Sequence, residues 1–387
     1  MITRIKICNV NAINECDLSF EKARYHYLNE MVYKDIVNPI AIYGANGSGK
    51  SSLLRAFSQL LALLIDEPNN LVGFMPNVCL FNRVTKELKA KQDENIDRKI
   101  VEQLSTAMNS SIELFFSIND KKYDYFVETS IEKNAIIREH LSCNKKTIFS
   151  RRINKYKYKN ESFILESKIY PVLRKLANDE TVGDVLINEA FNYLSHMAFV
   201  DDTRKLYQFK NAVEKSYMDF VVEKSNEVKS ILAKYNDFPL YTIISKVNPE
   251  KGKTEYFASI ETGEDKFNLP FGLMSSGMQN QSTLLSILLS IPNGSAFFID
   301  EIEAALHPLT IMDFIKVVQE KNIQLFFSSH NTYILSKLRP DQVVFSSWKN
   351  GCSKYNRLSD IYPNIREVNN IEKMYLNSMF DEEINEN

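Results

Sequence analysis

The pattern of apolar and polar residues changes several times along the 387-residue chain, and each change marks an element that we predict. Near the amino terminus, two short apolar runs separated by a turn at residues 11–14 predict a pair of strands. A third apolar run, residues 40–43, predicts a buried strand, and residues 51–65 place leucine and phenylalanine at helical spacing. Strand, short polar loop and helix are therefore expected in that order.

Alternating apolar and polar residues in the middle of the chain predict an antiparallel sheet. The runs 112–116 and 123–127 flank a turn at Asn119-Asp120, and residues 135–141 and 147–149 predict two further strands. Such a meander differs from the strand–helix alternation of a parallel sheet. We therefore predict an antiparallel β lobe that interrupts an α/β core.

Helical patterns lie on both sides of this lobe. Residues 88–108 are charged with scattered apolar positions and predict a helix. Residues 167–235 are predicted to be mostly helical, with breaks near Asn178, Asp201-Asp202 and Asn236. Strand patterns return at 240–245 and 256–260. The predicted parts are residues 1–110 for the first part of the core, 111–160 for the β lobe, 161–240 for a helical insertion and 241–387 for the second part of the core.

Composition places the chain among ordinary globular proteins. Hydrophobic residues make up 44% and charged residues 25%, and the formal net charge of −2 creates no global positive field for nucleic acid. Five cysteines are scattered without the spacing of a zinc site or a disulfide framework. No secretory signal and no bilayer-length apolar run is found, so we predict no membrane contact and expect a cytoplasmic location.

The loop after the third apolar run, residues 44–51, reads G-x-x-x-x-G-K-S, which is the P-loop pattern. Its glycines allow consecutive backbone N–H groups to turn toward phosphate oxygens. Lys50 is expected to reach the β- and γ-phosphates of ATP, and the Ser51 hydroxyl is expected to ligate Mg²⁺. The residues predicted to bind nucleotide here are Gly44, Asn46, Gly47, Ser48, Gly49, Lys50, Ser51 and Ser52.

Two carboxylates follow another apolar run later in the chain. Residues 296–299 predict a buried strand, which would place Asp300 beside the Mg²⁺ and Glu301 one step further, as the base for an attacking water. The alternative is a core strand followed by an acidic helix cap, and we favour the catalytic interpretation because a P-loop precedes it. His330 follows the apolar run 324–327 and is expected to contact the γ-phosphate or to orient water.

Polar residues at the start of one more helix predict a second anion-binding end. Ser275, Ser276 and Gly277 precede an apolar helical pattern at residues 282–291. The residues alone therefore predict a second place where an anion can bind.

Residues 151–159, Arg-Arg-Ile-Asn-Lys-Tyr-Lys-Tyr-Lys, are the most basic stretch of the chain. In a strand, the alternating lysines and tyrosines would occupy opposite faces. One interpretation is a surface that contacts the nucleic-acid backbone and stacks on bases. The other, more ordinary, interpretation is a solvated edge strand that its lysines protect from aggregation.

Taken in order, these motifs resemble the heads of ABC-type ATPases. The P-loop, the Ser-Ser-Gly signature, Asp300-Glu301 with Ala305-Leu306-His307-Pro308 after it, and Ser329-His330 are most similar to the SMC-like and OLD-like branch of bacterial AAA-type ATPases. That branch includes the ATPase components of anti-phage systems such as PARIS and Septu. The resemblance covers both ends of the chain, covers the β lobe loosely and hardly extends to the helical insertion.

The resemblance implies a set of roles for the motif residues. It leaves unchanged the roles given above for Lys50, Ser51, Asp300 and Glu301. It makes His330 the switch histidine of the family. The Ser-Ser-Gly signature would cap ATP that is bound to another subunit, in a homodimer or a higher homo-oligomer. The signature starts with methionine where relatives have leucine, and no Q-loop glutamine is recognised, so slow turnover is expected.

These features predict an ATPase that acts through other proteins. OLD-like relatives carry a nuclease domain after the head, whereas 57 residues follow His330 here (387 − 330), without an acidic metal-binding cluster. We therefore predict a sensor and switch subunit of a prokaryotic anti-phage system that controls a separately encoded effector, either a nuclease or a toxin. Two alternatives stay open: an SMC-like ATPase of DNA repair or maintenance that binds DNA, and a nucleotide-bound scaffold with little turnover.

Overall fold

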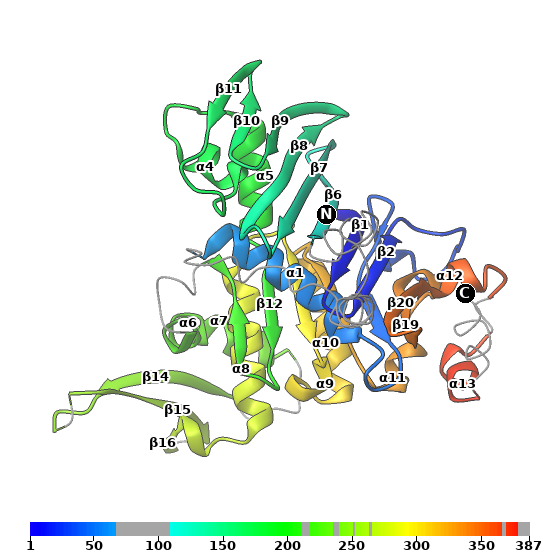
Figure 1. Cartoon of the computed structure of the whole chain (residues 1–387). Helices are drawn as coiled ribbons and strands as arrows, with labels where there is room; N and C mark the ends of the chain where they lie inside the picture. Colours follow the sequence, from blue (N-terminus) through cyan, green and yellow to red (C-terminus); the bar gives the residue numbers. More distant parts are fainter. Residues whose placement is uncertain are drawn as a thin grey trace, which may run out of the picture. The chain divides into compact units, whose positions relative to one another are not determined.

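The computed structural model describes residues 1–66, 109–210, 217–234, 240–250, 252–262, 265–365 and 369–377. The chain divides into two compact units (Figure 1). The first unit holds Met1–Ser195 and Phe326–Asn387, and the second holds His196–Leu325. Both ends of the chain therefore build the first unit. The helix predicted at residues 88–108 lies outside the described residues. The predicted division of the chain into two core parts, a β lobe and a helical insertion stays a prediction.

One sheet forms the framework of the first unit, with its strands in the order β11-β10-β9-β8-β7-β6-β1-β2-β20-β19-β5-β18. Neighbours from β11 to β2 are antiparallel, whereas β5 runs parallel to β19 and β18. The strands are β1 (Ile2–Val10), β2 (Ile13–Ser19), β5 (Ile40–Tyr43), β6 (Asn109–Ile118), β7 (Lys121–Ser130), β8 (Ala135–Cys143), β9 (Lys146–Arg152), β10 (Lys155–Tyr158), β11 (Glu161–Ile164), β18 (Gln324–Ser328), β19 (Val343–Lys349) and β20 (Cys352–Arg357). The sheet thus joins an antiparallel lobe to a parallel core.

Helices and short elements complete this unit. The helices are α1 (Lys50–Ile65), α4 (Val172–Asn178), α5 (Val185–Ser195), α11 (Thr332–Leu335), α12 (Leu358–Ile361) and α13 (Ile371–Leu376). The short elements are β3 (Val32–Tyr33), β4 (Ile36–Val37), and the 3-10 turns η1 (Asn29–Met31) and η4 (Pro340–Gln342). The leucines and phenylalanine predicted at helical spacing lie on the buried side of α1, which explains why their pattern was readable in the sequence.

The antiparallel lobe, β6 to β11, confirms the predicted meander. β6 pairs with β7 through a turn in which Asn119 and Asp120 take positive φ angles of 48° and 63°. Asparagine and aspartate enter that region more readily than most residues. Alternate side chains such as Ile112, Leu114 and Tyr125 are buried. The period of two therefore reflects one covered and one open face of the lobe.

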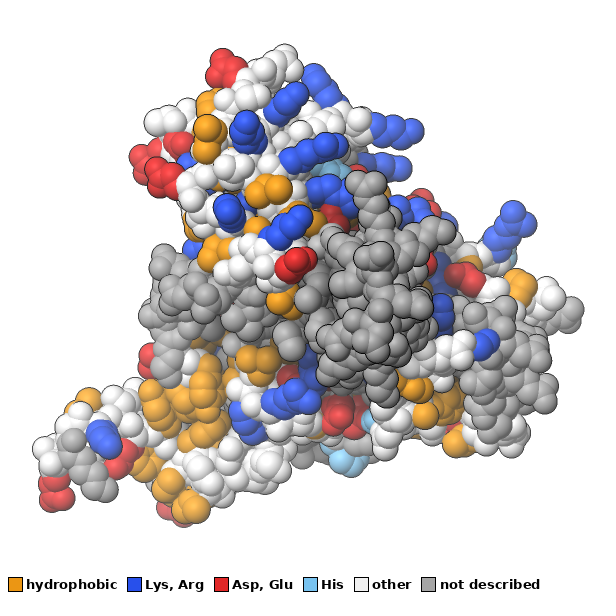
Figure 2. Space-filling model, in the orientation of Figure 1, with side chains coloured by type: hydrophobic (Ala, Val, Ile, Leu, Met, Phe, Trp, Pro, Cys, Tyr) orange, Lys and Arg blue, Asp and Glu red, His pale blue; other side chains and the backbone are white. Residues whose placement is uncertain are grey.

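The basic stretch at residues 151–159 divides between these faces. Lys155 and Lys157 on β10 are exposed, whereas Tyr156 and Tyr158 are buried, as the alternation predicts. Figure 2 shows several lysine and arginine side chains on this lobe. The tyrosines pack inward, so they offer no stacking surface to a nucleic acid.

Arg151, the first residue of that stretch, is structural. Its guanidinium lies 3.4 Å from Glu139 Oε2 and donates hydrogen bonds of 2.6 Å to the carbonyl oxygens of Lys168 and Tyr170. Both charged side chains are fully buried. Glu139 also accepts a hydrogen bond of 2.8 Å from the backbone N–H of Val172. The pair therefore fixes β8 and β9 to the start of α4, and Arg151 is removed from the predicted basic surface.

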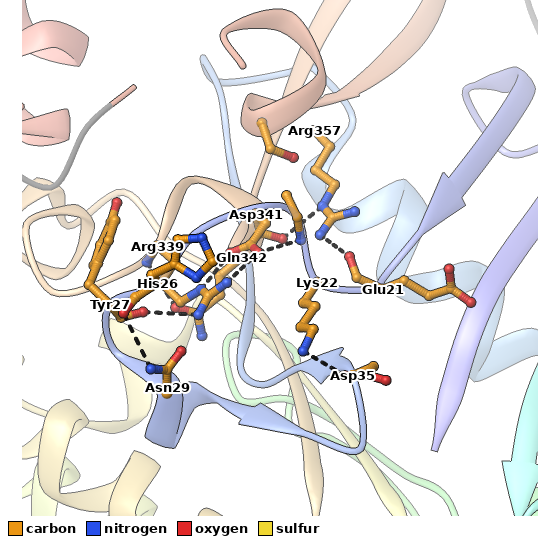
Figure 3. A network of polar contacts seen from close by, with 12 residues as sticks. Glu21, Lys22, His26, Tyr27, Asn29, Asp35, Arg339, Asp341, Gln342 and Arg357 are labelled. Atoms are coloured by element: carbon orange, nitrogen blue, oxygen red, sulfur yellow. Dashed lines mark hydrogen bonds and ion pairs between the residues drawn. The ribbon is translucent and has the colours of Figure 1, made fainter. Parts of the chain in front are cut away.

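The segment between β2 and β5, for which the sequence predicts no element, is held by a network of charged groups (Figure 3). Arg339 donates to both carboxylate oxygens of Asp341 at 2.9 and 2.8 Å, and to the carbonyl oxygen of Tyr27 at 2.9 Å. The Asp341 carboxylate also accepts the backbone N–H of Ala23 at 2.8 Å, and Arg357 donates to the Asp341 carbonyl oxygen at 2.8 Å. Side chains near the carboxyl end of the chain thus hold this segment in place.

The second unit has its own strands and helices. Its strands are β12 (Ala198–Asp201), β13 (Leu206–Gln208), β14 (Tyr241–Val247), β15 (Thr254–Thr262), β16 (Asp265–Pro270) and β17 (Ala296–Asp300). Its helices are α6 (Tyr217–Glu223), α7 (Ser225–Leu232), α8 (Ser276–Ser290), α9 (Ile302–Ala305) and α10 (Pro308–Glu320), and a 3-10 turn, η3, spans Phe271–Leu273. β12 runs parallel to β17, and β14, β15 and β16 form an antiparallel sheet.

The predicted helical stretch at 167–235 is wrong at β12 and β13. Ala198, Phe199, Val200 and Asp201 are all buried and pair with β17. A fully buried strand shows a short apolar run without alternation, which cannot be told from part of a helix by its period. The predicted break near Asp201-Asp202 is confirmed, because α5 ends at Ser195 and α6 begins at Tyr217. The pair lies where the core strand β12 ends.

Candidate nucleotide-binding site

The P-loop follows β5, whose four residues are all buried. Gly44 and Gly49 have φ angles of 150° and 107°, and Gly47 has 78°. A Cβ atom on Gly44 would lie 2.2 Å from the carbonyl oxygen of Ser346, and one on Gly49 would lie 2.0 Å from Ser353 Oγ. Gly44 and Gly49 are therefore required both by the backbone conformation and by the approach of neighbouring strands.

Lys50 begins α1 and folds back over its own loop. Its ammonium group donates hydrogen bonds to the carbonyl oxygens of Gly44 at 2.9 Å and Ala45 at 3.1 Å. The side chain is buried, whereas Ala45 and Asn46 are exposed at the tip of the loop. The ammonium is thus held by backbone oxygens close to the N-terminus of a 16-residue helix, where a phosphate group is electrostatically favoured.

Ser51 and Ser52 follow in the first turn of α1, and both are partly buried. The backbone N–H of Ser52 donates to the Gly49 carbonyl oxygen at 2.9 Å, so the turn is formed. A hydroxyl in this turn fits the role of a Mg²⁺ ligand, because serine oxygen is a hard donor and the helix start is open to phosphate.

Side chains from β19 and β20 contact the P-loop and hold it in place. No pattern in the sequence predicts these contacts. Ser48 Oγ and Ser346 Oγ are 2.6 Å apart and buried. The hydroxyl of Tyr355 donates to the Gly49 carbonyl oxygen at 2.7 Å, and burial holds the pKa of that phenol well above its usual range. Tyr355 therefore stays a neutral donor, and the loop rests on a fixed polar base.

His330 lies at the same edge of the sheet as the P-loop. β18 runs parallel to β5 with Ser328 opposite Ile42, so both strands end at this edge. The hydroxyl of Tyr43 donates to the Asn331 carbonyl oxygen at 2.9 Å, which fixes the loop that carries His330. The imidazole is exposed there. Ligands of α/β sheets bind at such carboxyl ends, as the predicted role requires.

The acidic pair lies in the second unit. Asp300 is the last residue of β17 and is buried, with 2% of its surface exposed. Glu301 follows with a φ angle of 52°, at the N-cap of α9. A glutamate in the left-handed region is uncommon. Asp201 lies opposite Asp300 on β12, a second carboxylate at this edge that the sequence reading missed.

The predicted signature forms the start of α8. The Ser275 hydroxyl accepts a hydrogen bond of 3.3 Å from the backbone N–H of Met278, so Ser275 is the N-cap residue. Ser276 and Gly277 are exposed beside it, and a Cβ on Gly277 would meet no atom within 4 Å. The start of this helix is thus open on its outer side.

A polar bridge links α8 to the segment after the acidic pair. Asn280 Nδ2 donates to the Ala304 carbonyl oxygen at 2.9 Å, and Lys205 Nζ donates to Asn280 Oδ1 at 3.1 Å. Lys205 also lies 3.0 Å from Asp202 Oδ1. Asn280 therefore joins the signature helix to α9 and to the β12–β13 turn, and nothing in the sequence pattern predicts it.

One protein-family model, described as "AAA domain, putative AbiEii toxin, Type IV TA system", matches residues 40–336. That range is more than half of the 387-residue chain and includes the P-loop, α8, the acidic pair and His330. The chain belongs to this family. Membership confirms the predicted class, an α/β P-loop ATPase of the AAA type, which binds nucleotide. The assignment to the OLD-like branch, and to systems such as PARIS or Septu, stays a prediction.

Several solved SMC heads are similar to this AAA-family chain. An SMC head bound to the C-winged helix domain of ScpA has a TM-score of 0.43 and 16% identity, and the match covers 92% of this chain and 96% of that chain. The SMC head domain from Thermotoga maritima has a TM-score of 0.44, 14% identity and coverages of 92% and 98%. The SMC head domain from Pyrococcus furiosus, with an extended coiled coil, has a TM-score of 0.41 and 14% identity, and the match covers 98% of this chain and 99% of that chain. At these TM-scores the likeness supports no conclusion about this chain.

No curated protein matches the chain. Among the described residues, no helix has the length and apolar character needed to cross a bilayer. The four cysteines in the described part, Cys8, Cys16, Cys143 and Cys352, are free thiols.

Proposed function

We propose that this protein is an ATP-driven switch subunit of an anti-phage system, which controls a separately encoded effector. The observation that carries the proposal is the span of the family match. One AAA-family range includes, in order, the P-loop, the Ser275 signature, Asp300-Glu301 and His330. A protein that keeps all four motifs has the parts needed to bind ATP, to respond to it and to hydrolyse it.

In this proposal the P-loop binds the phosphates of ATP through its backbone N–H groups and Lys50. Ser51 and Asp300 hold Mg²⁺, which neutralises the phosphate charge. Glu301 accepts the proton of the attacking water, and His330 orients the γ-phosphate. Asp300 is the buried last residue of β17, and a carboxylate at the end of a buried strand suits the metal role.

The signature is proposed to act on ATP bound to a second copy of the chain. Its support is the open start of α8, a 15-residue helix whose first residues Ser276 and Gly277 are exposed. A helix N-terminus attracts an anion, and an exposed one is available to another subunit. A two-fold dimer would then complete two sites by the same contact. The proposal that the head is of the ABC type depends on this dimer, because the signature must reach ATP on the other subunit.

The effector is proposed to be another protein, a nuclease or a toxin. The family description, which names a toxin of a toxin–antitoxin system, supports a defence context. The test is to express the chain with the products of its neighbouring genes and to purify complexes with ATP, using Glu301→Gln to retain the nucleotide. A partner that is bound in one nucleotide state and released in the other is expected. A chain that binds none of these products in either state would contradict the proposal.

The second candidate, a DNA-binding ATPase of the SMC-like kind, is favoured by one observation. Lys155 and Lys157 project from the exposed face of β10. Cations on an open sheet face suit the phosphate backbone of nucleic acid. ATPase activity that rises on addition of duplex DNA would support this candidate, and activity independent of DNA would favour the effector switch.

A further inference from the structure

The open face of the β lobe carries three side chains that can ligate a metal ion. Glu113 lies on β6, Asp124 on β7 and His140 on β8. Phe126 on the central strand is opposite both Glu113 and His140, and Asp124 is two residues before it, so the three share one face. One ligand atom from each residue lies within 4.8 Å of the other two.

The surroundings of the Asp124 carboxylate suit a cation. Its Oδ2 is 3.6 Å from His140 Nε2. Its Oδ1 is shut off from solvent and has no hydrogen-bond partner among the residues that the structure describes. A carboxylate oxygen that is closed off from solvent and accepts no hydrogen bond is unfavourable, and a bound cation would remove that cost.

The imidazole is held ready for ligation by its packing. The ring of His140 stacks on Phe126 with centroids 5.1 Å apart and an angle of 14° between the planes. Stacking restricts the plane of the ring, and Nε2 lies on the side of Asp124. A ligand that is already oriented loses less entropy when a metal binds.

We propose that Glu113, Asp124 and His140 bind one divalent transition-metal ion, of the Zn²⁺ or Mn²⁺ type, on the open face of the β lobe. Two carboxylates and one imidazole suit these ions, whereas Mg²⁺ prefers oxygen ligands throughout. The three side chains are partly exposed, so water completes the coordination. The ion would join β6, β7 and β8, and its stabilisation of the lobe would grow as the metal concentration rises above the dissociation constant.

A lysine competes for the same carboxylate. Lys6 Nζ is 3.1 Å from Glu113 Oε2, and the ammonium also lies 5.0 Å from the centre of the Phe115 ring. Metal binding must therefore displace Lys6 or use the other oxygen of Glu113. Replacing Lys6 by methionine keeps a long side chain over the ring and removes the competing charge, so it is expected to raise metal affinity severalfold.

The experiment titrates the whole nucleotide-free chain with Co²⁺, followed by visible absorption, and then displaces Co²⁺ with Zn²⁺. One saturable site without thiolate charge-transfer bands is expected, together with a higher melting temperature in Zn²⁺. His140→Gln and Asp124→Asn should each weaken binding at least about tenfold. Lys6→Met should strengthen it. His26→Gln, which changes a histidine outside the cluster, should have no effect, and Mg²⁺ should not compete.

Unchanged Co²⁺ affinity in both His140→Gln and Asp124→Asn would overturn the proposal, as would the absence of a saturable site in the unaltered chain. Thiolate bands would also overturn it, because they would assign the ion to a cysteine. If Asp124→Asn does not fold, as judged by circular dichroism, Glu113→Gln replaces it as the second ligand variant, with the same expected loss.

Discussion

Ser346 Oγ lies 2.6 Å from Ser48 Oγ and donates to the Tyr43 carbonyl oxygen at 3.1 Å. Because a hydroxyl has one proton, Ser48 must be the donor to Ser346. The last residue of β5 and the inner part of the P-loop are therefore held by one buried side chain of β19. Ser346, which is not part of the P-loop motif, therefore helps to define the shape of the loop.

Ser346→Ala should weaken both the fold and nucleotide binding. The substitution leaves the Ser48 hydroxyl and the Tyr43 carbonyl without their partner, a loss of about 1–3 kcal/mol for buried groups. Thermal unfolding and the affinity for a fluorescent ATP analogue measure the two effects. Ser290→Ala, which removes a hydroxyl on α8 far along the chain from the P-loop, is the control. Equal ATP affinity in the variant and the unaltered chain would show that the loop keeps its shape without Ser346.

Glu301→Gln should keep ATP binding and slow hydrolysis. Glu301 follows the buried end of β17 and is proposed as the general base, and loss of such a base costs about 10²–10⁴-fold in rate. Steady-state phosphate release and ATP affinity are measured side by side. The control is Glu303→Gln, which removes a neighbouring carboxylate in α9. Hydrolysis at the original rate in Glu301→Gln would assign the base to another residue.

These residues also mark what the sequence could and could not predict. The P-loop, β17 and the β meander were readable because each is a local pattern, in which apolar spacing or glycine position reports on nearby backbone. Ser346 is 298 residues from Ser48, and a serine in a strand carries no signal of its partner. The sequence could not predict the hydrogen bond from Asn280 to the Ala304 carbonyl oxygen for the same reason.

The basic stretch shows a mixed outcome. Its alternation predicted correctly which of its lysines and tyrosines are buried. It did not predict that Arg151 would pair with Glu139, because a buried arginine and an exposed one look alike in a sequence. β12 was missed because its run of four buried residues is too short to show a period.

Replacing Lys155, Lys157 and Lys159 by glutamate tests whether this surface binds nucleic acid. If it contacts phosphates, DNA affinity should fall and the slope of log K against log salt should flatten by a few units, since each phosphate contact contributes about 0.9. Filter binding at several salt concentrations measures the slope. Replacing Lys22 and Lys34, which are paired with Asp35 and Asp120, is the matched control. Unchanged binding at every salt concentration would leave the lysines as solvated charges on the open face of β10, which is not an edge strand because it pairs with both β9 and β11.

The last prediction concerns the two halves of the nucleotide site. Ser275→Arg places a large cation at the open start of α8, where the backbone is proposed to contact ATP on another subunit. This variant should bind ATP through its own P-loop but should not dimerise on ATP. Lys50→Ala removes the ammonium held over the loop and should weaken binding itself. Each variant alone should therefore be nearly inactive as an ATPase, for different reasons.

Mixing the two variants separates action within one chain from action between chains. A heterodimer has one site with an intact P-loop from the Ser275→Arg chain and an intact signature from the Lys50→Ala chain. If the signature acts on the partner's ATP, the mixture should recover activity, up to one working site in each heterodimer. Tagged pull-down establishes that heterodimers form, and phosphate release is measured across mixing ratios. A signature that acts on the ATP of its own chain would leave both sites of the heterodimer defective. If ATPase activity does not recover at any mixing ratio, the arrangement in which facing heads share two nucleotides is therefore excluded.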